Sequence, residues 1–75
     1  MLKVRIKYKE NEPPIVYDNV ENIYTYPEPE RITKAYCSIC QRDINNRRYY
    51  TNIYNKPLVI LIESMPIKTY YVDFG

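Results

Sequence analysis

The sequence predicts a small, mostly β protein with an antiparallel sheet or barrel-like domain of five to six strands. Residues 2–9 alternate between apolar and basic side chains, the period-2 pattern of a strand with one buried face. Residues 58–62 are five consecutive large aliphatic side chains, preceded by Pro57 and followed closely by Pro66. A run this short suits a strand covered on both faces better than a helix. We therefore expect residues 58–62 to form the central strand.

The first hairpin is expected to join residues 2–9 to an extended segment at residues 15–26, across a polar turn that ends in two prolines. Asn19 interrupts the extended segment and predicts a bend or bulge there. In the interpretation that we favour, the basic residues of the first strand guard an open sheet edge against aggregation. In the other, they contribute to a ligand surface.

The opening Lys-Val-Arg-Ile-Lys-Tyr, the short turn and residues 16–23 resemble the opening hairpin of many small uncharacterised β-rich proteins of phages and prophages. This resemblance covers about a third of the chain and includes no functional residues. It implies a phage, a prophage or another mobile element as the source.

Two structures compete for residues 30–43. The apolar residues of this segment recur at helical spacing, which predicts one helix packed on the sheet and changes the class to α+β. Against a helix stands its content of Ile, Thr, Tyr and Cys, which are neutral or poor helix formers. A turn at residues 43–46 would also connect a strand here to the next one. We favour the strand and keep the helix as the alternative.

The rest of the chain predicts two further strands. At residues 47–54, Tyr49, Thr51 and Ile53 share one face, and Tyr50 belongs to the other. Residues 67–74 are expected to form the last strand, which completes a single domain over residues 1–75.

Composition limits the function classes. A domain of 75 residues buries little apolar surface, so a metal, a disulfide or a partner subunit would add needed stability. The chain has ten tyrosines and no tryptophan or histidine. Tyrosine is common at recognition surfaces, although most of these rings are expected to tile the sheet. Without histidine, the commonest general base and metal ligand is missing, and we expect a non-enzymatic protein with no cofactor.

Cys37 and Cys40 form the only C-x-x-C pair. Zinc requires four ligands in a structural site, so this pair could bind zinc only if two chains shared the ion. A redox pair would need a thioredoxin-like context at a helix N-terminus. We favour a third interpretation, in which both cysteines are small, partly buried core residues.

Cations and tyrosines gather between residues 42 and 54. Guanidinium groups neutralise phosphates, and tyrosine rings stack on unpaired bases. The sequence therefore predicts a weak nucleic-acid surface on this segment. Lys3, Arg5 and Lys7 would extend it if the first strand lies next to residues 42–54. Its candidate residues are Arg42, Arg47, Arg48, Tyr49, Tyr50 and Tyr54. The carboxylates of Asp18 and Glu21 are expected to be solvated.

The sequence favours a non-enzymatic protein-binding module, either a phage or mobile-element factor that binds a host protein or a homodimer. The alternatives are a weak nucleic-acid binder and a zinc-bridged dimer. The chain has neither a secretory signal nor an apolar run long enough to cross a bilayer. We expect a cytoplasmic protein, in the host cytoplasm if phage-encoded, with no membrane partner.

Overall fold

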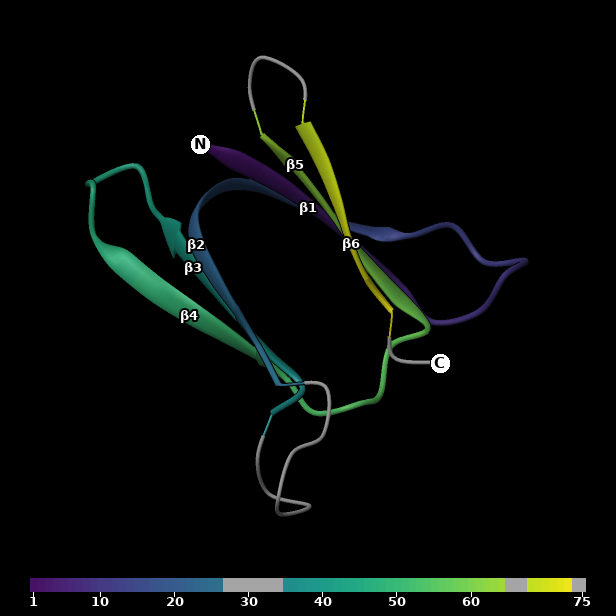
Figure 1. Cartoon of the computed structure of the whole chain (residues 1–75). Coiled ribbons are helices and arrows are strands. Elements are labelled where there is room, and N and C mark those ends of the chain that lie inside the picture. The colour runs from purple at the N-terminus through teal and green to yellow at the C-terminus, as the bar shows by residue number, and fades with distance from the viewer. Residues whose placement is uncertain (27–34, 65–67, 74–75) are drawn as a thin grey trace.

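The protein folds into one antiparallel sheet that curls into a half-barrel (Figure 1). The computed structural model describes residues 1–26, 35–64 and 68–73. The sheet has six strands in the order β4-β3-β2-β1-β5-β6. Their bounds are β1 Leu2–Lys7, β2 Ile15–Thr25, β3 Cys37–Arg42, β4 Arg48–Ile53, β5 Val59–Ser64 and β6 Lys68–Asp73. The predicted mostly β class is confirmed.

The alternative helix at residues 30–43 is wrong where the structure describes it. Residues 37–42 form β3, which pairs with β2 on one side and β4 on the other. Residues 30–34 of that alternative lie outside the described residues. Two neighbouring strands satisfy the backbone of β3, so tertiary pairing overrides the helical spacing of its apolar residues. The described residues contain no helix, and hence none of the length and apolarity needed to span a membrane.

The long central strand β2 bends because it carries an extra residue against each of its neighbours. Its register with β1 shifts between the pairs Leu2↔Val20 and Val4↔Tyr17. Its register with β3 shifts between Val20 and Asn22. Each irregularity is a β-bulge, which bends a strand and increases its twist.

Asn19 lies within the first of these bulges and has a φ of 53°. This left-handed conformation costs Asn less than most residues, because its short polar side chain tolerates it. The bend or bulge predicted at Asn19 is confirmed.

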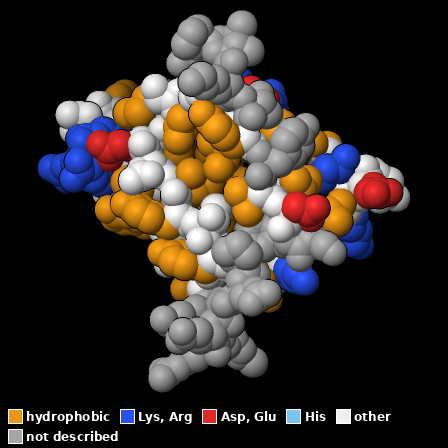
Figure 2. Space-filling model, in the orientation of Figure 1, with side chains coloured by type: hydrophobic (Ala, Val, Ile, Leu, Met, Phe, Trp, Pro, Cys, Tyr) orange, Lys and Arg blue, Asp and Glu red, His pale blue; other side chains and the backbone are white. Residues whose placement is uncertain are grey.

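The curvature encloses an apolar core on the concave face of the sheet. Figure 2 shows hydrophobic side chains gathered between the two arms of the half-barrel. The five strands from β1 to β5 all contribute. The buried cluster consists of Val4, Ile6, Val20, Cys37, Ile39, Ile53 and Ile60.

Two predictions about strand position are wrong. Strand β1 lies inside the sheet, between β2 and β5, so its basic row guards no open edge in the folded protein. On β1, Lys3 Nζ lies 3.7 Å from Asp18 Oδ1, and the Arg5 guanidinium forms an ion pair with Glu63. The apolar run belongs to β5, which is next to the edge strand β6 rather than central. Of this run, Ile60 enters the core, while Leu61 on the other face is only partly buried.

We predict that Ile39→Ala lowers the free energy of unfolding by about 2–5 kcal/mol, because it leaves a cavity in the centre of a small core. Ile39 is fully buried, whereas Ile44 is 99% exposed. Ile44→Ala is therefore the matched control and should change stability by no more than about 0.5 kcal/mol. Urea unfolding followed by circular dichroism measures both variants. Equal losses from the two would contradict the described core.

Candidate functional site

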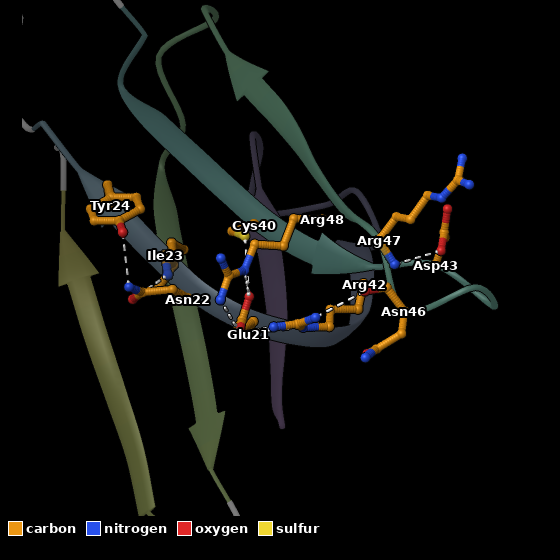
Figure 3. A network of polar contacts seen from close by, with 10 residues as sticks. All are labelled: Glu21, Asn22, Ile23, Tyr24, Cys40, Arg42, Asp43, Asn46, Arg47 and Arg48. Atoms are coloured by element: carbon orange, nitrogen blue, oxygen red, sulfur yellow. Dashed lines mark hydrogen bonds and ion pairs between the residues drawn. The ribbon is translucent and has the colours of Figure 1, made fainter.

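Two arginines converge on one carboxylate on the convex face of the sheet (Figure 3). Arg42 of β3 and Arg48 of β4 are directly paired across the two strands. Glu21 of β2 accepts hydrogen bonds from both. Arg42 donates through Nη2 at 2.9 Å and Nε at 3.3 Å, and Arg48 through Nε at 2.7 Å and Nη2 at 3.3 Å. Glu21 therefore separates two like charges that would otherwise repel across the ladder.

The bulge in β2 gives Glu21 this position. The register with β3 shifts by one residue between Val20 and Asn22, so Glu21 is the extra residue. Val20 enters the core on the concave side, while the Glu21 carboxylate joins the arginines on the convex side. Three adjacent strands are thus tied together by one acidic side chain.

Hydrogen bonds from Arg48 and Arg42 lower the pKa of Glu21 from its ordinary value of 4.5 to about 2. The carboxylate therefore stays ionised at neutral pH. Cys40 lies beneath this cluster, with its Sγ 3.7 Å from Glu21 Oε2. Tyr50 faces Cys40 across the strand pair, and a hydrogen bond with the Cys40 thiol is the main cause that raises the pKa of Tyr50. The Tyr50 phenol therefore stays protonated near neutral pH.

The turn between β3 and β4 fixes the position of Arg47. The Asp43 carboxylate accepts hydrogen bonds from the backbone nitrogens of Asn45 at 2.8 Å and Arg47 at 2.9 Å. Asn46 has a φ of 63°, as tight turns of this kind require. The Arg47 side chain points away from the cluster (Figure 3). It makes no ion pair with any residue in the described ranges.

The three predicted tyrosines are exposed but do not share one face. Tyr49 is paired with Gln41 on the concave side, whereas Tyr50 is paired with Cys40 on the convex side. Tyr54 follows the end of β4. Their exposed fractions are 45%, 58% and 55%.

The six candidate nucleic-acid residues thus gather on the β3–β4 hairpin and its ends, with two of the three arginines already bound to Glu21. Lys3, Arg5 and Lys7 do not extend this group. Their strand, β1, is separated from β3 and β4 by β2.

Cys37 and Cys40 lie on opposite faces of β3. Residues three apart in a strand point to opposite sides, and Cys37 belongs to the core cluster while Cys40 contacts Glu21 on the convex side. The structure therefore does not bring the two free thiols into one site. The described residues contain no group of three or more potential metal ligands. Burial raises the pKa of Cys37 to about 12, consistent with a core residue.

Glu21 is the site residue that sequence reasoning missed. The sequence suggested a solvated carboxylate, but its two arginine partners lie 21 and 27 positions along the chain. Only the strand order brings them together. The one local signal was the irregular segment around Asn19, which foretold the bulges but not what would face Glu21.

Comparison with known proteins finds no match: no family model fits the chain, and neither a curated protein nor a solved structure is significantly similar to it.

We predict that Glu21 makes stability depend on pH in acid. Its pKa is lower in the folded chain, so its contribution is complete above about pH 4.5 and is lost as the pH falls toward about 2. Glu21→Gln should be less stable than the parent at neutral pH, and this difference should shrink across that window. Urea unfolding at several pH values measures it. Glu10→Gln, which changes an exposed loop carboxylate, is the control; an identical pH profile for both variants would refute the role of Glu21.

We also predict that the Cys37 thiol reacts only when the protein unfolds. It is fully buried, and its high pKa keeps it protonated at about pH 8, so little reactive thiolate forms. In a Cys40→Ser variant, a thiol reagent should modify Cys37 at a rate that rises with urea in parallel with unfolding. Rapid modification in the absence of urea would contradict the buried position.

Proposed function

We propose that this protein is a non-enzymatic protein-binding module and that it binds its partner through the β4 surface, defined here as Arg47, Tyr49, Tyr50 and Tyr54. The observation that supports this proposal most directly is the exposure of all three tyrosine rings, between 45% and 58%, on one edge strand and its end. Tyrosine is enriched at protein interfaces, and these rings stand on both faces of the same open edge strand.

The chemistry of the β4 surface supports protein recognition. Tyrosine offers a large contact area and a hydroxyl group at a small entropy cost. Tyrosine and arginine are both enriched among the residues that dominate binding energy at interfaces. The Arg47 guanidinium has no ion-pair partner within the described part of the chain, so its charge is available to a ligand.

The support beneath the β4 surface favours binding in a fixed geometry. Glu21 joins β4 to β3 and β2 through its two arginines, and Asp43 organises the turn that presents Arg47. Ser38 Oγ adds a hydrogen bond of 2.9 Å to Asn52 Oδ1 across β3 and β4. A surface held in one conformation loses less entropy on binding.

A host protein bound by a phage or mobile-element factor is the partner class that we propose, in the cytoplasm. Two free cysteines on opposite faces of a strand suit a reducing compartment. A weak nucleic-acid binder is the second candidate. It is favoured by the exposed Tyr50 and Tyr54 rings and by Arg47, which has no ion pair among the described residues. It is the weaker one, because Arg42 and Arg48 already bind Glu21.

We predict that a Tyr50→Ala/Tyr54→Ala double variant loses a partner that the parent protein retains from a lysate of a bacterial host. Removing two exposed rings should reduce recovery at least about tenfold, because hot-spot aromatics contribute about 2 kcal/mol or more each. Tyr70→Ala is the matched control, since Tyr70 is 54% exposed on the opposite edge strand β6. Tagged proteins of equal thermal stability are compared by quantitative mass spectrometry.

Nuclease treatment of the same lysate separates the two candidates. A partner that survives nuclease and is lost only with the Tyr50/Tyr54 variant supports the protein-binding module. Loss of the recovered material on nuclease treatment supports the nucleic-acid binder instead. Equal recovery by all three proteins, or none, would overturn binding through the β4 surface.

A further inference from the structure

We propose that the open edge of β4 receives an extended acidic segment of the partner as an additional strand. This inference rests on the proposed function, in which the β4 surface binds a protein. It adds the mode of binding, through backbone hydrogen bonds, and the charge of the segment that is bound.

Among the described residues, the backbone hydrogen-bonding groups along one side of β4 have no partner. Of the described strands, only β3 pairs with β4. The carbonyl oxygen of Arg47 accepts from Asp43 and that of Ile53 accepts from Tyr36, so odd-numbered residues direct their polar groups toward β3. Alternate residues of an antiparallel strand point in opposite directions. The N–H and C=O groups of Arg48, Tyr50 and Asn52 therefore point to the open edge.

Nothing in the sequence of β4 blocks this edge. Proteins protect open edges with proline, lysine, bulges or very short strands. Residues 48–53 contain neither proline nor lysine, and their register with β3 is unbroken over six residues. The one charged residue of the strand, Arg48, is engaged by Glu21. The edge is thus regular and long enough to template another strand.

Aromatic rings stand on both sides of the edge. Tyr49 projects on the concave side and Tyr50 on the convex side. In a strand added beside β4, successive side chains alternate between these two sides. Each ring would contact side chains of the new strand directly or diagonally across the ladder, and such aromatic cross-strand contacts stabilise pairing.

The charges around the edge select an acidic segment. From residue 44 to residue 62 the chain contains Arg47, Arg48 and Lys56 and no Asp or Glu. Arg47 immediately precedes β4, and the exposed Lys56 follows it in the connection to β5. Glu21 engages Arg48 and Arg42 together, which leaves that group one positive charge. Arg47 and Lys56, near the two ends of the strand, have no ion-pair partner among the described residues. Acidic residues at the ends of an added strand would meet opposite charges there.

The same charges disfavour a second copy of this chain. A second β4 strand brings no carboxylate to this edge, because residues 44–62 contain no Asp or Glu. The two-fold symmetry of such a pair repeats this lack of opposite charge at both ends. An acidic segment therefore complements Arg47 and Lys56 better than a second copy of the chain does.

The test uses amide hydrogen exchange of the full chain, measured by nuclear magnetic resonance with and without a synthetic peptide. The probe is an eight-residue capped peptide of alternating glutamate and valine, and the control peptide has lysine in place of glutamate. In the free protein, the amides of Arg48, Tyr50 and Asn52 should exchange fast, because they face solvent. The glutamate peptide, at up to about 1 mM, should protect these three amides; the lysine peptide should not.

A charge-reversed variant, Arg47→Glu/Lys56→Glu, sharpens the test. Both residues are exposed, so the fold should persist, and circular dichroism checks this. The variant should bind the glutamate peptide about tenfold more weakly, as two exposed ion pairs are lost. It should gain affinity for the lysine peptide.

Several results would overturn the inference. No binding of the glutamate peptide, binding that protects other amides, or equal binding of both peptides would each do so. Concentration-dependent protection of the three edge amides without any peptide would assign the edge to a second copy. If these tests fail while Tyr50 and Tyr54 still govern capture of a protein partner, the proposed function stands and only the strand-addition mode is wrong.

Discussion

The structure depends on the bending of one strand. Strand β2 runs through the middle of the sheet, and it carries an extra residue against β1 on one side and against β3 on the other. Without such bends, a six-stranded sheet of this size would leave its apolar face open, since the described residues provide no second layer. The two bulges bring the arms of the sheet toward each other. The concave side then becomes the core.

The same bulges organise the charges on the convex side. Without the bulge, the register between β2 and β3 would change and residue 21 would lie at another position relative to β3. Arg42 and Arg48, which are directly opposed, would then face each other without a carboxylate between them. Placing Glu21 there couples the curvature of the sheet to the electrostatics of the hairpin that it supports. Because Glu21 is only 28% exposed, solvent weakens this coupling less than it would at a fully exposed pair.

The fold was more predictable from the sequence than the site. Period-2 alternation along β1 and the turn residues at 43–46 are local signals, so strand identity and the β3–β4 hairpin followed from neighbouring residues. The strand order could not be predicted in this way, because no local sequence signal indicates that β1 pairs with β5. For that reason β1 was expected at an edge and β5 at the centre. Likewise, the candidate residues on β4 were recognisable by type, whereas the Glu21 contact and the opposite faces of Cys37 and Cys40 depend on register.

The position of β1 has a consequence for folding during synthesis. Both strands of the first hairpin, β1 and β2, lie within the first 25 residues, but the other neighbour of β1, β5, begins only at Val59. Until β5 is made, that side of β1 is unpaired, and long-range pairings of this kind form slowly because a long loop must close first. We expect the basic row of Lys3, Arg5 and Lys7 to disfavour pairing with a second chain during this interval. Charges that guard no edge of the finished sheet would then guard a transient edge while the rest of the chain is made.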